Sequence, residues 1–412
     1  MTAATILRPL APSEQIFAYS EVFVGYCARV SGPLNLTALG DALDALVTAH
    51  PSLGAQLEPT EPTGHTLVTS GPPEIVLTVA DGDPEHLLTG AEPDQRRALG
   101  TLHVVRGGNT ASVTLLVHHS IADATHALEL FDRLWECYTA ATTGRTPTLP
   151  AGRPPQPVED LLTARSIARR PLPGSAAPPR TTPPLPPAEA LGPNEAGYPP
   201  LVTTRCRLSR ARTAALIAHG HRERVTVHSL VAAALLVTES EARNVPVHDL
   251  LCSYSVDLRR RVHPPIGPTE GTNVLGFAGY RPAPGTATPL AVARGVLAAL
   301  RTGLTTGYIQ QTPLQLPDML AVPAADPFGT VMTTNWGRIR PPRATGLRFD
   351  DFRTMMIAKP DPTGRRPPQP GGGTSIISTF DDRLSLEIHH PPEFGSVQTP
   401  RITRIEELLT RL

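Results

Sequence analysis

The spacing of apolar residues changes abruptly near residue 118. Residues 111–117 form a short apolar run rich in leucine and β-branched side chains, which is typical of a buried strand. His118, His119, Ser120 and Asp123 follow this run. The apolar residues beyond them recur at intervals of three and four, the spacing of one helix face: Ala124, Ala127, Leu128, Phe131, Leu134, Trp135 and Tyr138. The pattern therefore predicts a strand that ends in two histidines and turns directly into a helix.

The same criteria predict further helices and strands on both sides of this stretch. An amphipathic helix that ends before Pro51 is indicated by Leu36, Leu39, Leu43, Leu46 and Val47. Strands are expected near 74–79, 101–106, 201–208, 250–256, 330–335, 374–377 and 384–388. Helices are expected after Ser209, at 227–237, where the pattern is apolar almost all round and predicts burial, and at about 401–412. Strands mixed with helices indicate an α/β fold.

Prolines are concentrated between residues 147 and 200 and include five Pro-Pro pairs. Such a segment cannot sustain a helix or a central strand, and its backbone favours extended polyproline geometry. Since 412 residues exceed one ordinary core, we expect three parts: an N-terminal lobe at 1–146, a crossover linker at 147–200 and a C-terminal lobe at 201–412. A ligand for an SH3-type domain is the less common alternative for the proline-rich part.

The two histidines supply a side chain that takes up and returns a proton near neutral pH. Adjacent side chains of a strand point to opposite faces, so at least one of His118 and His119 is expected to be structural. A second interpretation is local, because Ser120 and Asp123 have the spacing of a capping box, with Asp in place of the usual Glu. Spacing alone does not decide between catalysis and helix capping.

Composition excludes several classes of function. The 37 basic and 37 acidic residues balance to a formal net charge of zero, so there is no surplus of cations to bind nucleic acid. Cys27, Cys137, Cys206 and Cys252 lie far apart without CxxC spacing, which argues against a zinc site and a disulfide framework. The sequence has no signal-like N-terminal segment and no apolar run of about 18 residues. We therefore expect a cytoplasmic protein without a transmembrane segment.

The motif His118-His119-x-x-x-Asp123 resembles the HHxxxD[G] signature of the condensation-domain and chloramphenicol-acetyltransferase-like acyltransferases. The wider chain is most similar to their phthiocerol/phthiodiolone dimycocerosyl transferase branch, the polyketide-associated acyltransferases. The segments that carry this similarity, in order, are 10–17 (LAPSEQIF), 42–46 (ALDAL), 50–53 (HPSL), the central motif, 256–259 (VDLR), 264–265 (PP), 268–273 (PTEGTN) and 308–311 (YIQQ). The chain departs from this motif at Ala124, where the family usually has glycine. The effect of the alanine on the reaction rate and on the size of the substrate stays open.

The resemblance implies two chloramphenicol-acetyltransferase-like lobes, an α+β sandwich type of α/β fold, with a channel between them. It implies an O-acyltransferase that moves an acyl chain from a thioester to a hydroxyl of a polyketide or lipid. The thioester donor would be a phosphopantetheine carrier protein, within or apart from a polyketide synthase, or coenzyme A. His119 is the expected general base, with no acyl-enzyme, bound cofactor or metal. An amide-forming condensation enzyme and a catalytically silent recruitment module are the alternatives.

The resemblance also assigns supporting residues. His118 is expected to support His119, and Asp123 to have a structural role in which it pairs with Arg259. Asn273 is expected either to line the channel or to form a turn. Arg224 and Arg301 match basic residues implicated in carrier contact, and arginine binds phosphate and acidic surfaces well.

Three further features are weighed as structural. His389 and His390 precede two prolines and lack an Asp four residues on, so a role at a strand end is expected. The glycines at 371–373 lack the Lys and Ser/Thr of a phosphate loop, which favours a flexible hairpin. Trp336 is expected to pack rather than to take part in chemistry.

Overall fold

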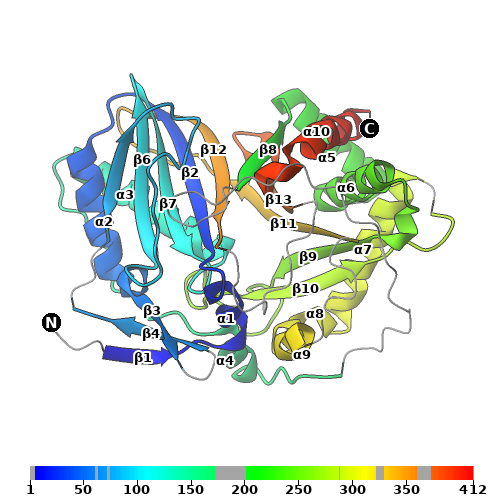
Figure 1. The fold of residues 1–412 in the computed structure, drawn as a ribbon, viewed down its shortest axis with the longest axis horizontal. Coiled ribbons are helices and arrows are strands. Elements are labelled where there is room, and N and C mark those ends of the chain that lie inside the picture. Colours follow the sequence, from blue (N-terminus) through cyan, green and yellow to red (C-terminus); the bar gives the residue numbers. More distant parts are fainter. Residues whose placement is uncertain are drawn as a thin grey trace. The chain divides into compact units, whose positions relative to one another are not determined.

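The computed structural model describes residues 5–60, 64–71, 75–171, 201–286, 288–321, 329–359 and 373–411. The chain divides into two compact units, each of which combines helices with a large β-sheet (Figure 1). Unit 1 comprises Met1–Arg165, His263–Val274 and Arg340–Thr363, and unit 2 comprises Ser166–Val262, Leu275–Ile339 and Gly364–Leu412. The expected α/β class with two lobes is confirmed.

Unit 1 is built on a five-stranded sheet with the strand order β12-β2-β7-β6-β5. Neighbouring strands are antiparallel except β5 and β6, which are parallel. The strands are β2 (Phe23–Ser31), β5 (Leu77–Asp81), β6 (Gly100–Gly107), β7 (Thr110–His118) and β12 (Arg348–Ile357). A separate three-stranded sheet contains β1 (Thr5–Pro9), β4 (Gly64–Thr69) and β3 (Gln56–Thr60), in that order. The helices are α1 (Pro12–Ala18), α2 (Leu36–Ala49), α3 (Ala124–Thr142), α4 (Val158–Thr163) and the 3-10 helix η1 (Pro51–Gly54).

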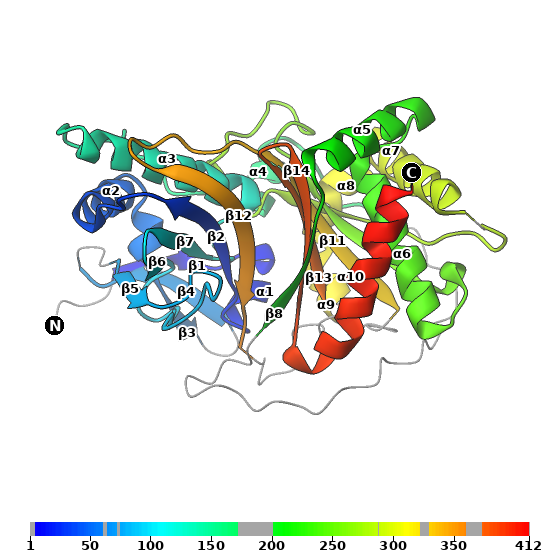
Figure 2. The same ribbon diagram turned by 90° about the horizontal axis from the view of Figure 1, so that it is seen from above.

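The apolar run before the two histidines forms the central strand of this sheet, β7. Every residue of β7 after Thr110 is buried, which explains why the run is continuous rather than alternating. α2 and α3 lie side by side along the sheet (Figure 2). The predicted apolar face of α3 packs on β12, with the Trp135 ring 4.8 Å from Phe349 and the Phe131 ring 6.0 Å from Phe352, centroid to centroid.

Unit 2 is built on a six-stranded sheet with the order β10-β9-β11-β13-β14-β8. β11 is parallel to both of its neighbours, and the other pairs are antiparallel. The strands are β8 (Val202–Arg207), β9 (Leu251–Asp257), β10 (Leu275–Tyr280), β11 (Thr330–Ile339), β13 (Thr374–Phe380) and β14 (Arg383–His390). The helices are α5 (Arg210–Glu223), α6 (Val227–Arg243), α7 (Pro289–Thr305), α8 (Tyr308–Gln311), α9 (Leu316–Ala321) and α10 (Gly395–Thr410), with the 3-10 helices η2 (Val247–Asp249), η3 (Thr312–Gln315) and η4 (Pro392–Phe394).

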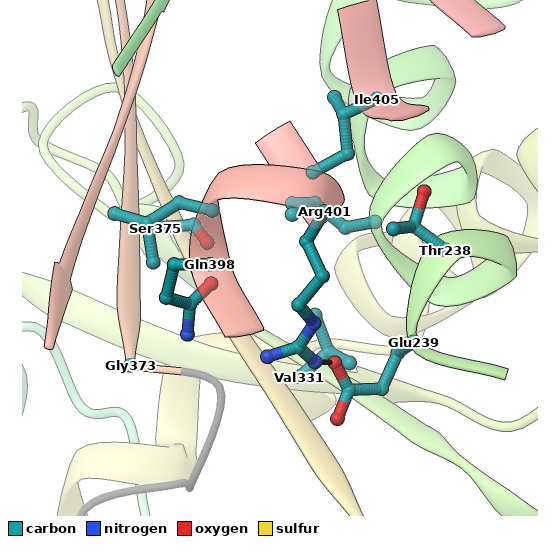
Figure 3. Close-up of a pocket in the computed structure, with 10 residues that line it drawn as sticks. Thr238, Glu239, Val331, Gly373, Ser375, Gln398, Arg401 and Ile405 are labelled. Carbon is teal, nitrogen blue, oxygen red and sulfur yellow. Dashed lines mark ion pairs between the residues drawn. The ribbon is translucent and has the colours of Figure 1, made fainter. Parts of the chain in front are cut away.

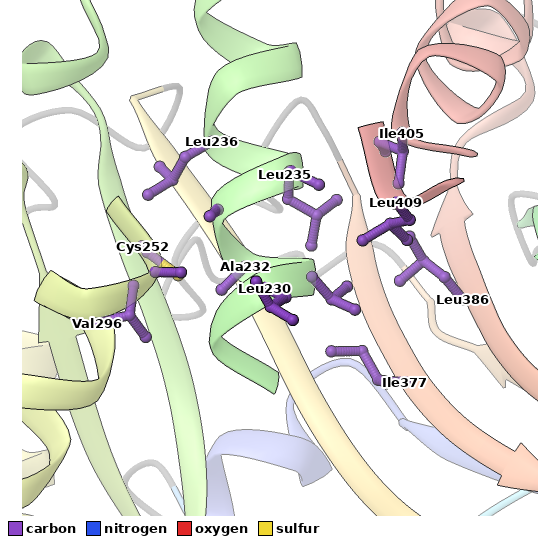
Figure 4. Close-up of a cluster of buried hydrophobic side chains, with 14 of the residues drawn as sticks. Leu230, Ala232, Leu235, Leu236, Cys252, Val296, Ile377, Leu386, Ile405 and Leu409 are labelled. Atoms are coloured by element: carbon purple, nitrogen blue, oxygen red, sulfur yellow. The ribbon is translucent and has the colours of Figure 1, made fainter. Parts of the chain in front are cut away.

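The core of unit 2 surrounds α6. Every residue from Ser229 to Leu236 is buried, and apolar side chains of the sheet, α7 and α10 pack around this helix (Figure 4). The prediction of a buried helix at 227–237 is confirmed, because neighbours on nearly every side require an apolar surface all round. Within the described residues no single helix has the length and apolar character of a membrane span. α5 and α6 meet that test only when joined across a 99° bend.

Two later segments belong to unit 1, whereas the sequence placed them in the lobe at 201–412. β12 extends the sheet of unit 1 by pairing with β2 along its whole length, from Ser31 opposite Arg348 to Phe23 opposite Ile357. Residues 263–274 are tied to unit 1 by a bridge between Gly271 and Gln156. Pairing between distant segments leaves no local mark in composition, so the sequence could not predict this division.

The expected linker also begins later than predicted. Unit 1 continues to Arg165 and includes α4, whose Val158, Leu161 and Leu162 are buried. A short apolar cluster among the prolines is therefore enough to anchor this part of the segment. The remainder, 172–200, lies outside the described residues, as do Gly371 and Gly372 of the expected glycine hairpin.

Candidate active site

The two histidines lie at the end of β7 in the centre of the unit 1 sheet. The backbone N–H of His118 donates to the carbonyl of Leu99 at 2.7 Å, and that of His119 donates to the carbonyl of Val22 at 2.8 Å. Backbone on both sides of the strand therefore fixes where the imidazoles begin.

His118 has the surroundings of a structural histidine. Its side chain is fully buried, and its ring stands edge-on to Phe23 with centroids 4.8 Å apart. Nδ1 accepts a hydrogen bond from the backbone N–H of Ser120 at 3.2 Å, so the neutral ring carries its proton on Nε2. Burial, with a smaller effect of the charges of His119 and His65, lowers the pKa of His118 to about 3. The ring is therefore uncharged at neutral pH.

His119 lies against an aromatic ring of α1. Its imidazole is stacked on Phe17, with centroids 3.9 Å apart and planes 11° from parallel. Burial lowers the pKa of His119, while its own backbone carbonyl, the charge of Asp123, the Asn273 side chain and the Ala122 carbonyl act in the opposite direction. Nδ1 of the His119 ring is buried and has no hydrogen-bond partner among the described residues.

Asp123 is the N-cap of α3. One carboxylate oxygen accepts the backbone N–H of His126 at 3.0 Å, and the other accepts that of Val274 at 2.8 Å. The backbone N–H of Asp123 donates to the carbonyl of Thr272 at 2.8 Å. The fully buried carboxylate thus joins the start of α3 to the segment 272–274, which belongs to unit 1.

The predicted capping box between Ser120 and Asp123 is wrong. The helix begins at Ala124, so Asp123 itself is the cap and Ser120 lies before the helix. The Ser120 hydroxyl instead donates to the backbone carbonyl of Glu14 at 2.8 Å. Ser120 and Asp123 have the spacing of a box, but the turn after β7 delays the helix by three residues, which local spacing could not show.

Asn273 holds the turn that carries His119. Its side-chain amide donates to the carbonyl of His119 at 2.7 Å and, more weakly, to that of Ser120 at 3.5 Å. The residue is 4% exposed. These contacts join Asn273 to the turn that carries His119, and its place in a channel stays a prediction.

Glu14 is a buried residue that connects several parts of the site through hydrogen bonds. The sequence pattern did not single it out. It is fully buried, and Arg8 donates to both of its carboxylate oxygens at 2.6 and 2.8 Å. The backbone N–H of Ala11 and the hydroxyl of Thr272 complete its partners at 2.9 and 2.8 Å. With its carbonyl bound by Ser120, Glu14 connects α1, the turn after His119 and the segment 272–274. The sequence predicted neither the helix that carries Glu14 nor the burial of its side chain.

The other expected site residues lie in unit 2. Arg259 follows β9 and is 3% exposed, and its backbone and guanidinium contact the carboxylate of Asp257 at 2.9 and 3.3 Å. Arg224 is the exposed C-cap of α5, in a left-handed conformation with φ 55°, and Arg301 is exposed on α7. The pairing of Asp123 with Arg259 and the role of Arg224 and Arg301 in carrier contact stay predictions.

The second histidine pair is engaged with β8. His389 Nδ1 lies 3.0 Å from the hydroxyl of Thr203, and His390 Nε2 lies 2.8 Å from that of Thr204. Both residues are buried at the end of β14, which is the strand-end role that the sequence predicted. Among the described residues, no group of three or more His, Cys, Asp or Glu side chains could hold a metal ion.

Comparison with known sequences links this geometry to one group of enzymes. Residues 198–389 match the family model described as phthiocerol/phthiodiolone dimycocerosyl transferase C-terminus. The chain is 33% identical to the phthiocerol/phthiodiolone dimycocerosyl transferase of Mycobacterium ulcerans (strain Agy99) over 98% of this chain and 95% of that protein. It is also 33% identical to the protein of the same name from Mycobacterium tuberculosis (strain ATCC 25618 / H37Rv), over 86% of each chain.

Solved structures agree with this result. Polyketide synthase associated protein 5 from Mycobacterium tuberculosis superimposes with a TM-score of 0.80 and 29% identity, covering 99% of this chain and 98% of that one. The first condensation domain of the calcium-dependent antibiotic synthetase gives a TM-score of 0.67 at 17% identity, over 98% of this chain and 97% of that one. Trichothecene 15-O-acetyltransferase from Fusarium sporotrichioides gives 0.65 at 12% identity, over 99% and 95%. The last two share the fold.

Proposed function

The chain belongs to the phthiocerol/phthiodiolone dimycocerosyl transferase family of acyltransferases, and we propose that His119 is its general base. In this proposal the enzyme moves an acyl chain from a thioester to a hydroxyl group. The observation that carries it is the state of His119: a lowered pKa and a ring plane fixed by the stack on Phe17. A neutral imidazole with its Nε2 lone pair available is the form that accepts a proton from an alcohol.

The chemistry needs one proton to move in each direction. The acceptor hydroxyl donates its proton to Nε2 of His119 while its oxygen attacks the thioester carbonyl carbon. The tetrahedral intermediate then collapses, the carbon–sulfur bond breaks, and the imidazolium returns the proton to the leaving thiolate. The products are an ester and a free thiol, and His119 is again neutral.

The other polar groups near His119 are engaged elsewhere, which supports direct transfer without an acyl-enzyme. The Ser120 hydroxyl is fully buried and bound to the Glu14 carbonyl. The Asp123 carboxylate accepts two backbone N–H groups, which suits an architectural role rather than proton transfer. The four cysteines are buried, and burial raises the pKa of Cys252 to about 12, so that thiol is a poor nucleophile.

The substrates follow from the family. The names of the relatives describe transfer of a dimycocerosyl group to phthiocerol or phthiodiolone, and we extend the class to this chain as a long acyl donor and a hydroxylated polyketide or lipid acceptor. The donor is a thioester of a carrier protein's phosphopantetheine or of coenzyme A. For a carrier donor, we propose that the exposed Arg224 and Arg301 contact the acidic carrier.

The test is product analysis by mass spectrometry with the purified full chain. Acyl-carrier and acyl-coenzyme A thioesters are each combined with an alcohol or an amine of matched carbon skeleton, and the intact protein is weighed in the same reactions. We expect an ester, no amide and no acylated protein, with product formation nearly abolished in His119→Gln. A protein adduct that forms and decays with turnover would refute direct transfer, and an amide as main product would favour a condensation enzyme. Absence of any product with His119 intact would favour a recruitment module.

A further inference from the structure

Residues 17–22 form a corner between α1 and β2 that is bound to His119 in two ways. The backbone N–H of Val22 donates to the carbonyl of Phe17 at 3.0 Å, and the carbonyl of Val22 accepts the backbone N–H of His119 at 2.8 Å. The Phe17 ring in turn stacks on the imidazole of His119. The shape of this corner therefore decides how the two rings meet.

The corner contains one residue in an unfavourable backbone conformation. Glu21 has φ 44°, in the left-handed region that residues other than glycine, asparagine and aspartate rarely adopt. Its backbone N–H donates to the carbonyl of Ala18 at 3.3 Å. A conformation of this kind persists only where the surrounding contacts hold it.

Lys359 contacts the corner through both its backbone and its side chain. It is the only lysine of the chain, and it follows β12, the strand that pairs with β2 (Figure 2). Its backbone N–H donates to the carbonyl of Ser20 at 2.7 Å, and its ammonium group lies 2.8 Å from a carboxylate oxygen of Glu21. The two side chains are 25% and 17% exposed, so salt screens their interaction less than that of a fully exposed pair.

We propose that the ion pair of Lys359 and Glu21 is a positioning pair for His119, an inference that rests on the proposed role of His119 as the general base. The pair keeps Glu21 in its left-handed conformation. Without it, Glu21 relaxes towards negative φ, which rotates the peptide groups of the corner and moves the Phe17 ring on the imidazole. The pair acts on the reaction through the corner alone.

The first test is spectroscopic and needs no substrate. In the NMR spectrum of the full chain with ¹³C-labelled histidine, the ring current of Phe17 should shift the imidazole protons of His119 upfield. The signal is identified by its loss in His119→Gln. Lys359→Met should move it towards the position of an unstacked histidine, and Lys359→Arg, which keeps a cation within reach of Glu21, should restore most of the shift. An unchanged signal in Lys359→Met would overturn the proposal.

A double-mutant cycle tests whether Lys359 acts through Glu21. Glu21→Gly removes the carboxylate and places at this position a residue that adopts positive φ without strain. Lys359→Met should then have no further effect on the His119 signal, because the pair is already absent and only coupled residues deviate from additivity. A further shift as large as that in the wild-type background would contradict the proposal.

Kinetics test the link to catalysis. Lys359→Met should lower kcat by about tenfold or more, the size of effect that follows from misplacing a catalytic group, with little change in KM. A shifted His119 signal with unchanged kcat would support the positioning of the ring but refute His119 as the general base. A lowered kcat with an unshifted signal would refute the positioning.

Arg401→Met is the control for a general loss of stability. Arg401 of α10 forms a buried ion pair with Glu239 of α6 in unit 2 (Figure 3). Its removal should lower the midpoint of thermal unfolding, because a buried charge loses a partner, and should leave the His119 signal in place. An equal shift of that signal in Arg401→Met and Lys359→Met would overturn the proposal.

Discussion

The phenyl ring of Phe17 and the imidazole of His119 lie face to face, 3.9 Å apart and 11° from parallel. They come from elements far apart in the chain, α1 and the end of β7. Glu14 fixes α1 one turn before Phe17, through Arg8 and Thr272. The stack therefore sets the plane of the ring, and with it the direction of the Nε2 lone pair.

Replacing Phe17 by leucine should lower kcat by about ten- to hundredfold, since small misplacement of a catalytic group has effects of this size. KM should change little, because the expected effect is on the orientation of His119 rather than on substrate binding. Steady-state kinetics and the pKa of His119 from NMR titration measure the two expected effects. Phe23→Leu is the control, because Phe23 is a buried phenylalanine that contacts His118 instead. Equal losses of kcat in the two variants would indicate a general effect on folding rather than positioning of His119.

His119→Ala should lower turnover by about 10²–10⁴-fold, the usual contribution of a general base. The midpoint of thermal unfolding should change little. In the wild-type enzyme the acid limb of kcat/KM should lie below the pH of about 6.5 at which an ordinary histidine titrates, because the pKa of His119 is lowered and the base works only when unprotonated. Near-normal turnover of His119→Ala with the enzyme's own substrates would contradict the mechanism.

The different surroundings of His118 and His119 were predictable in part from the sequence. Alternation along a strand predicted that His118 and His119 differ, and the apolar run and the helix after Ala124 fixed the element that carries them. The sequence could not predict the positions of Phe17, Glu14 and β12 in the fold. Each acts through a contact with a segment distant in sequence, and neither burial of a carboxylate nor the register of a distant strand pair is encoded by local periodicity.

His118 should make the fold sensitive to acid. Its pKa in the folded protein is about 3, whereas an unfolded histidine titrates near 6.5, so protonation favours unfolding. The stabilisation from a neutral His118 is complete above about pH 6.5 and is lost as the pH falls toward 3, by an amount on the order of several kcal/mol. His118→Asn keeps an acceptor near the position of Nδ1 and should flatten this part of the pH dependence, as measured by denaturant unfolding between pH 7 and 4. His86→Asn, at an exposed histidine, should leave the slope as in the wild type. An unchanged slope in His118→Asn would show that other groups control acid unfolding.

Charge reversal of Arg224 and Arg301 to glutamate should reduce kcat/KM with an acyl-carrier donor by about tenfold or more, since charges at an interface steer association. A short soluble thioester should be used at the wild-type rate. Arg145→Glu with Arg153→Glu makes the same change in net charge at exposed positions of unit 1 and serves as the control. Equal losses with both donors, or an equal effect of the control pair, would rule out a specific docking role.

Asp123 has either a local structural role only, as the cap of α3, or a distant one as well, as the partner of Arg259. Its two oxygens already accept the N–H groups of His126 and Val274, so Asp123→Asn places an amide donor against one of them and should cost about 1–3 kcal/mol of unfolding free energy. If Asp123 also pairs with Arg259, as the family resemblance predicts, breaking a buried ion pair raises the cost to about 3–5 kcal/mol. A double-mutant cycle of Asp123→Asn and Arg259→Gln, followed by denaturant unfolding, separates the two because only residues in contact show a coupling energy. A coupling well above about 0.5 kcal/mol would support the pair, whereas additive effects within that margin would assign Asp123 to the α3 cap and the Val274 contact alone.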